Sequence, residues 1–89
     1  MIPFDWRRHL GLAKSEAEIA DRASRFLKAE LKRAGVTYAD LAKRLSKHGV
    51  PGETEDSIKA KLKRGTFPAT FFLACLAALE IEAVQLAEL

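Results

Sequence analysis

The sequence contains little cysteine, proline or glycine. Its 89 residues include one Cys, three Pro and five Gly. A single cysteine, Cys75, cannot form an intramolecular disulfide, which excludes a small secreted fold held by bridges and leads us to expect a cytoplasmic protein. The scarcity of helix breakers, together with 48% hydrophobic residues, is typical of one ordered globular domain.

Long hydrophobic runs are also missing. The longest uncharged stretch, residues 65–79, falls short of the roughly 20 apolar residues that a membrane-spanning helix needs. Residues 1–12 lack the apolar segment of a signal peptide. We therefore expect no membrane as a partner.

Basic residues are absent from the C-terminal part of the chain. Residues 66–89 contain no Lys or Arg and three acidic residues, whereas residues 25–65 contain eleven basic and five acidic residues. A basic middle segment suits a polyanion such as nucleic acid, which would associate the protein with the nucleoid. The simpler alternative is that these lysines only solvate exposed helix faces.

Capping signals and apolar spacing predict a long first helix. Ser15 and Glu18 form a capping-box pattern at its start, and Gly35 is a typical residue just after a helix end. Apolar residues recur at helical spacing between these signals, namely Ile19, Ala23, Phe26, Leu27, Leu31 and Ala34.

Two interpretations of the segment before this helix stay open. Its apolar residues Phe4, Trp6 and Leu10 suit a short helix over the core, whereas Arg7 and Arg8 suit an arm that reaches into a minor groove.

Two short helices joined by a turn are predicted next. Thr37 caps the first of them, with Asp40 at its third position, and Gly49 ends it. The segment VPGE is a turn, because proline and glycine both disfavour a continuing helix. Thr54 then caps a helix that Gly65 terminates.

A last helix is predicted to begin at Pro68 and to be apolar on nearly all sides. Such a helix has to be buried almost all round, which a single small layer of helices hardly allows, so we expect self-association. The composition of residues 80–89 favours helix, although their alternation also suits a short strand exchanged across a dimer.

In order and spacing, these helices resemble the repressor/Cro-type helix-turn-helix family, the xenobiotic-response-element-like regulators. The segments that carry the resemblance are LKAELKRAGVTYADLAKRL, SIKAKLKRG and FPATFFLACLAALEI, which are similar to the family's first two, third and fourth helices. The chain resembles in particular an uncharacterised bacterial branch of small domains of unknown function. One difference is the connection SKHGVPGETED, which is longer than the family's usual turn.

The resemblance implies a fold class and a division of the chain. The fold would be an all-α, lambda-repressor-like helix-turn-helix domain of four to five helices, covering residues 22–81. Residues 1–21 would be an N-terminal extension, and residues 82–89 a dimerisation tail.

The resemblance also makes the third helix the one that enters the major groove. Ile58 and Leu62 lie one turn apart and should face the core, which turns Lys59 and Lys63 outward. No Arg, Asn or Gln stands on that outer ridge, so we expect DNA binding with modest sequence preference and a large electrostatic share. The predicted DNA contacts are Thr37, Tyr38, Lys43, Arg44, Lys47, Thr54, Ser57, Lys59, Ala60, Lys61, Lys63 and Arg64.

Catalytic chemistry is not indicated. His9 and His48 have no Cys, Asp or Glu at metal-ligand spacing, and Cys75 lies among Phe and Leu. Neither a Ser/His/Asp set nor a glycine-rich phosphate loop occurs. We expect no metal, no other cofactor and no enzymatic activity.

Two functions of different classes fit this pattern. The favoured one is a homodimer that binds double-stranded DNA as a transcriptional regulator or nucleoid-type factor. The alternative is a module without DNA binding that docks a partner protein, such as a toxin or an RNA polymerase subunit, and the acidic residues Glu55 and Asp56 favour it. The predicted dimer interface consists of Phe71, Phe72, Leu73, Leu76, Leu79, Val84 and Leu86.

Overall fold

A computed structural model describes residues 15–89 of the chain. This part contains four α-helices, one turn of 3-10 helix and no strand, which confirms the predicted all-α class. The predicted N-terminal helix or arm, with Arg7 and Arg8, lies outside the described residues. The elements are α2 (Glu16–Ala34), α3 (Tyr38–Lys47), α4 (Glu55–Arg64), α5 (Ala69–Ala78) and η1 (Leu86–Glu88).

Three helices begin where the capping signals predict. The side-chain oxygen of Ser15 accepts the amide of Glu18 at 3.2 Å. Thr37 accepts the amide of Asp40 at 3.1 Å, and the carboxylate of Asp40 accepts the amide of Thr37 in return. Each cap satisfies an amide that the first helical turn leaves without a partner.

The cap of α4 is also reciprocal. Thr54 accepts the amide of Ser57 at 3.1 Å, and the Ser57 hydroxyl accepts the amide of Thr54 at 2.8 Å. Gly65 ends the helix in the left-handed conformation, with φ of +76°. A β-carbon at this position would lie 2.8 Å from the carbonyl oxygen of Ala20, so only glycine allows α4 to end this close to α2.

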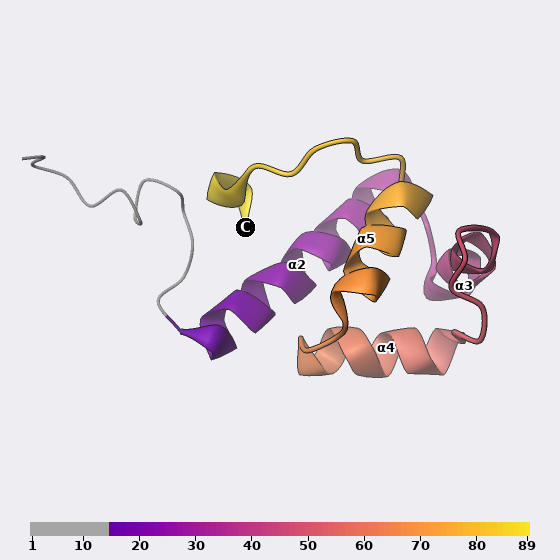
Figure 1. Cartoon of the computed structure of the whole chain (residues 1–89), viewed down its shortest axis with the longest axis horizontal. Helices are drawn as coiled ribbons and strands as arrows, with labels where there is room; N and C mark the ends of the chain where they lie inside the picture. The colour runs from indigo at the N-terminus through magenta and orange to yellow at the C-terminus, as the bar shows by residue number, and fades with distance from the viewer. Residues whose placement is uncertain (1–14) are drawn as a thin grey trace, which may run out of the picture.

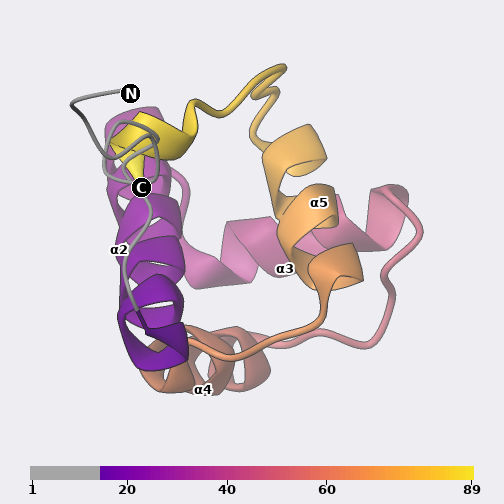
Figure 2. The ribbon, with the colours of Figure 1, turned by 60° about the vertical axis from the view of Figure 1, so that its left-hand side comes forward.

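The helices pack in a chain of contacts, in which α4 packs against α2 and α3, and α3 also packs against α5. Figure 2 shows α2 and α5 on opposite sides, with α3 spanning the space between them and α4 closing the lower end. In Figure 1, α3 is seen nearly end-on while α4 lies across the view, so these two consecutive helices cross instead of running antiparallel. The serine hydroxyl of Ser24 on α2 donates to the carbonyl oxygen of Leu62 and joins α2 to α4.

Every helix contributes to a single apolar core. Ile19, which the spacing places on the core face, is instead 45% exposed. The reason is that α4 ends against α2 at Ala20 and Ser24, so the first turn of α2 extends beyond this contact. The buried apolar residues are Leu27, Leu31, Val36, Leu41, Leu45, Ile58, Leu62, Phe71, Ala74, Cys75 and Ala78.

The apolar helix α5 is buried on one side only. Phe71 and Cys75 are buried against the core, whereas Leu73 is 62% exposed. Phe67, just before the helix, lies 5.2 Å from Phe71 between ring centres and stacks on Phe72 at 6.2 Å. Across residues 15–89, no helix combines the length and the apolar character needed to cross a membrane.

The C-terminal tail is neither of the two predicted regular structures. Residues 81–85 have no regular structure, and only the 3-10 turn Leu86–Glu88 follows them. Glu80 interrupts the helix because its φ of +59° lies in the left-handed region. The tail then returns over α2, as both views show, and Arg22 donates a hydrogen bond to the Leu89 carbonyl oxygen at 2.8 Å (Figures 1 and 2).

Candidate nucleic-acid interface

The outer ridge of α4 is exposed as predicted. Ile58 and Leu62 have exposures of 0% and 1%, which directs their side of α4 into the core. The side turned away from the core carries Asp56, Ala60 and Lys63, with Lys59 on its flank, and all four are exposed. The helix thus presents a charged face whose orientation is determined by its two core residues.

Three basic side chains of α4 have no partner in the part of the chain that the structure describes. Within residues 15–89, Lys59, Lys63 and Arg64 take part in no hydrogen bond or ion pair, and all three are exposed. Their positive charges are therefore accessible to a ligand in solution. Lys59 and Lys63 are four residues apart and lie on one ridge of the helix.

Two other predicted contacts of α4 are engaged within the fold. The Nζ of Lys61 lies 2.7 Å from a carboxylate oxygen of Glu53, and the Ser57 hydroxyl donates to the other oxygen at 2.6 Å. The Lys61 ammonium also lies 5.4 Å from the centre of the Phe71 ring. Ser57 and Lys61 are only half-exposed for this reason, and Thr54, the cap of the helix, is exposed beside them.

These contacts favour the ionised form of the Glu53 carboxyl. Its burial alone would raise the pKa, but the hydrogen bonds from Lys61 and Ser57 and the charge of Lys61 outweigh this effect and hold the pKa below its usual range. Glu53 therefore neutralises Lys61 and links the turn to α4. The sequence alone did not identify Glu53 in this role, and the only signal for it is its position one residue before the Thr54 cap.

The N-terminus of α3 already carries a carboxylate. The hydrogen bonds from Thr37 lower the pKa of Asp40, and the charges of Lys43 and Arg44 act in the same direction. The Thr37 hydroxyl accepts the Asp40 amide, and its interaction with the Asp40 carboxylate is the largest cause of the lowered pKa, so this side chain is engaged in the cap. Tyr38 is half-buried and packs against the core, so it presents only part of its surface.

The basic residues of α3 have different environments. Lys43 and Lys47 are exposed, lie four residues apart and, within the described part of the chain, have no ion-pair partner. Arg44 donates a hydrogen bond to the carbonyl oxygen of Ala78 at 3.1 Å, at the end of α5. A positive charge at the C-terminus of a helix interacts favourably with the helix dipole, so Arg44 stabilises the end of α5. Sequence reasoning missed this structural role.

The turn between α3 and α4 consists of residues 48–54 and is bonded to both helices. The amide of Val50 donates to the Leu45 carbonyl oxygen at 2.9 Å, and the Val50 side chain packs against the core. Gly49 and Gly52 have φ values of +84° and +92°. The longer connection is therefore an ordered part of the fold between the two helices.

The predicted dimer residues divide into three groups by exposure. Phe71 is 2% exposed and fills the monomer core, which differs from its expected place at an interface. Leu73 and Leu86 are 62% and 42% exposed and have little cover within the described chain. The half-buried members of the set are Phe72, Leu76, Leu79 and Val84.

Nucleophilic and metal-binding groups are sparse in the described residues. Burial raises the pKa of the Cys75 thiol to about 12, with a smaller effect from the charge of Glu53. The thiol is therefore neutral at physiological pH and has little nucleophilic character. Residues 15–89 contain no group of three His, Cys, Asp or Glu side chains arranged to hold a metal ion.

Comparison with known proteins gives a family match. A family described as a domain of unknown function (DUF6471) matches residues 10–84. No curated protein and no solved structure matches the chain.

Proposed function

The chain belongs to the family of the domain of unknown function DUF6471, and we propose that it binds double-stranded DNA as a homodimer, with α4 in the major groove. In this role it would act as a transcriptional regulator or a nucleoid-type factor. The family description names no activity, so the proposal rests on the chain's own residues.

The observation that carries the proposal is the ridge of α4. Lys59 and Lys63 are exposed on one ridge of α4, whose Ile58 and Leu62 are buried, and neither ammonium is used within residues 15–89. Phosphates of a duplex attract such charges, and release of their counterions drives binding. Lys43 and Lys47 on the adjoining helix α3 are two further exposed positive charges.

The arrangement of α3 and α4 also supports the proposal. In helix-turn-helix proteins, the two helices cross at about 90–120°, and the second one is presented to the major groove. In Figure 1, α3 and α4 likewise cross and do not run antiparallel, with the turn of residues 48–54 between them.

Sequence preference should be modest. The ridge offers lysines, which are flexible point charges and discriminate bases less well than the planar guanidinium of arginine. The carboxylates of Glu55 and Asp56 stand in the first turn of α4 and would repel phosphates. Binding should therefore depend mainly on charge and on the shape of the duplex.

A homodimer would use the exposed part of α5 and the tail. Leu73 and Leu86 are the large apolar side chains exposed in these segments. Two copies related by a two-fold axis would place their α4 helices in successive major grooves, about 34 Å apart.

The test is the salt dependence of binding to a generic labelled duplex. The Lys59→Glu/Lys63→Glu variant should lose binding while remaining folded, because both residues are exposed. Wild-type affinity should fall with salt, with a log-log slope of about −0.9 for each phosphate contacted. Absence of wild-type binding at low salt would overturn the proposal.

Single variants provide a matched control for this test. Lys63 and Lys32 are both exposed lysines in the last turn of a helix, α4 and α2 respectively. Lys63→Glu should weaken binding far more than Lys32→Glu, although the two substitutions change net charge equally. Equal effects would show a nonspecific response to net charge and would contradict a binding surface on α4.

The exposure of Leu73 favours a second candidate function, docking of a partner protein on α5. At 62% exposure, Leu73 is the most exposed large apolar residue of the described chain, on a helix that carries no charge. In this case Lys59→Glu/Lys63→Glu would leave binding of the partner protein unchanged. Leu73→Glu would release that partner, while the free protein would be a monomer with or without the substitution.

A further inference from the structure

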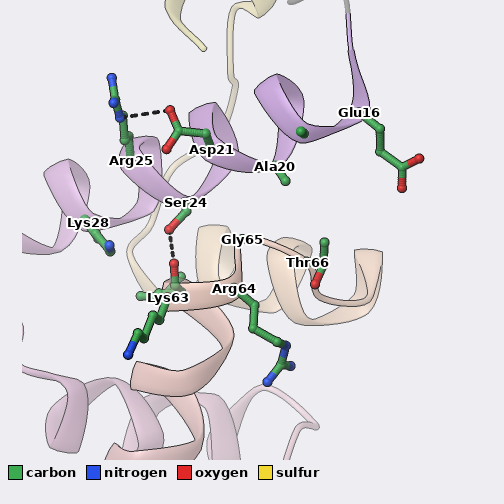
Figure 3. A pocket seen from close by; sticks show the side chains of 12 residues that line it. Glu16, Ala20, Asp21, Ser24, Arg25, Lys28, Lys63, Arg64, Gly65 and Thr66 are labelled. Carbon is green, nitrogen blue, oxygen red and sulfur yellow. Dashed lines mark hydrogen bonds and ion pairs between the residues drawn. The ribbon is translucent and has the colours of Figure 1, made fainter.

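A groove of about 480 Å³ lies between α2 and the end of α4. Its wall on the α2 side runs from Glu16 to Lys28, and its other wall consists of residues 62–66. Figure 3 shows the hydrogen bond from Ser24 to the Leu62 carbonyl oxygen at the base of the groove. The contact of Gly65 with Ala20 sets the spacing between the two walls.

Positive charge predominates in this groove. Four basic residues line it, Arg25, Lys28, Lys63 and Arg64, against the two acidic residues Glu16 and Asp21. Asp21 is already paired, because its carboxylate lies 3.0 Å from the guanidinium of Arg25. The remaining acid, Glu16, extends from the first turn of α2, away from the lysines (Figure 3).

Lys28 and Lys63 approach the groove from different helices. Figure 3 shows both side chains extending to the same side, Lys28 from α2 and Lys63 from α4. Within the described residues, neither ammonium forms an ion pair or a hydrogen bond. Two unpaired positive charges from separate helices repel each other, and a shared anion would relieve that repulsion.

The groove also offers hydrogen-bond donors suited to an anion. The hydroxyl of Thr66 lines it and, in the described part of the chain, forms no hydrogen bond. The carbonyl oxygen of Leu62, which would repel an anion, instead accepts the Ser24 hydroxyl. An open groove with ammonium and hydroxyl donors suits a phosphodiester, whose oxygens accept hydrogen bonds, better than it suits an apolar ligand.

We propose that the α2–α4 groove holds a backbone phosphate of the bound duplex, with Lys28 of α2 and Lys63 of α4 as its paired contacts. This inference rests on the proposed DNA binding by α4 and extends that surface to a helix outside the α3–α4 pair. Lys28 then fixes the position of α4 along the major groove of the DNA. It does so without contacting a base, because a phosphate contact carries no sequence information.

The test compares Lys28→Ala with Lys32→Ala in binding to a generic duplex over a series of salt concentrations. Both lysines are exposed on α2, but only Lys28 lines the groove. Lys28→Ala should reduce the magnitude of the log-log salt slope by about 1, as expected for one lost phosphate contact. Lys32→Ala should leave the slope unchanged.

Two duplexes of unrelated sequence complete the experiment. Lys28→Ala should weaken binding to both by the same factor, whereas a factor that differs between them would indicate base contact and overturn the phosphate assignment. If the Lys28→Ala and Lys32→Ala curves coincide while Lys59→Glu/Lys63→Glu still abolishes binding, the groove proposal fails and DNA binding by α4 stands. If the wild-type protein binds neither duplex, both proposals fail.

Discussion

The ammonium of Lys61 lies 2.7 Å from the carboxylate of Glu53, eight residues earlier in the chain. The same ammonium stands 5.4 Å from the centre of the Phe71 ring. One side chain of α4 therefore contacts the turn that precedes α4 and the helix that follows it. This geometry makes Glu53 a structural residue in a region that is otherwise exposed and basic.

Glu53→Gln should destabilise the protein. The side chains of Glu53 and Lys61 are only 12% and 22% exposed, so their attraction is less screened than that of a surface pair. We expect a loss of about 1 to 2 kcal/mol in the free energy of unfolding, between the values for exposed and buried pairs. Urea unfolding measures it, with the exposed Glu55→Gln as a control for a lost charge near the same helix start. Equal losses in the two variants would contradict this role of Glu53.

Glu53 should also make stability depend on pH. Its pKa in the folded protein lies below the ordinary value of 4.5, so the unfolded chain binds this proton more tightly. The stabilisation is complete above the ordinary value and is lost as pH falls through the folded pKa. Wild-type protein should lose more stability on acidification from neutral pH than Glu53→Gln does. The contribution of Asp40 is common to both proteins, so parallel curves would exclude the effect.

Gly65→Ala should cost more stability than Gly35→Ala. Both glycines have a positive φ, +76° and +69°, but a β-carbon at Gly65 meets the Ala20 carbonyl oxygen whereas one at Gly35 meets nothing within 4 Å. Gly35→Ala therefore reports the left-handed backbone alone, at about 1–2 kcal/mol. The added clash should cost Gly65→Ala about 1 to 3 kcal/mol more. Thermal or urea unfolding of the pair would show whether α4 needs this close approach.

Cys75 should react with thiol reagents only when the protein unfolds. Its side chain is fully buried, and burial raises the pKa to about 12 from an ordinary 9.0. Because the thiolate is the reactive form, modification at mildly alkaline pH should be slow and should accelerate with urea below the unfolding midpoint. Above pH 9.0 the unfolded thiol ionises while the folded one does not, so stability should fall. Rapid labelling without urea would contradict the burial of Cys75.

Leu73→Glu should separate association from folding. Leu73 is 62% exposed, so the substitution should change the free energy of unfolding by no more than about 0.5 kcal/mol. If α5 forms the dimer, sedimentation should show a monomer and duplex affinity should fall with it. An unchanged association state would place the dimer contact elsewhere or exclude the dimer.

The sequence predicted the helices well because their ends depend on local chemistry. Thr37 and Thr54 satisfy amides within three residues of themselves, and Gly65 ends α4 through its own backbone conformation. Ile58 and Leu62 were placed inward by spacing alone, and both are buried. The tail could not be predicted in this way, because a single backbone angle at Glu80 decides where α5 ends.

The candidate surface was less predictable than the helices. Lys59, Lys61 and Lys63 are similar in sequence terms, yet among residues 15–89 only Lys61 finds an ion-pair partner, because the path of the turn brings Glu53 back to it. Arg44 likewise reaches Ala78, thirty-four residues away, which no local pattern indicates. Such contacts depend on how the helices cross. Sequence spacing alone therefore could not separate the basic side chains that are exposed to a ligand from those that bond within the fold.

The contact between Glu53 and Lys61 can form before the contact between Arg44 and Ala78. Closing the loop between Arg44 and Ala78 costs about 1.3 kcal/mol more chain entropy than closing the one between Glu53 and Lys61, because closure entropy grows with the logarithm of loop length. The turn and α4 can thus pack against each other before α5 packs onto the core. Addition of α5 then completes the core, which is also the order in which a ribosome releases these segments.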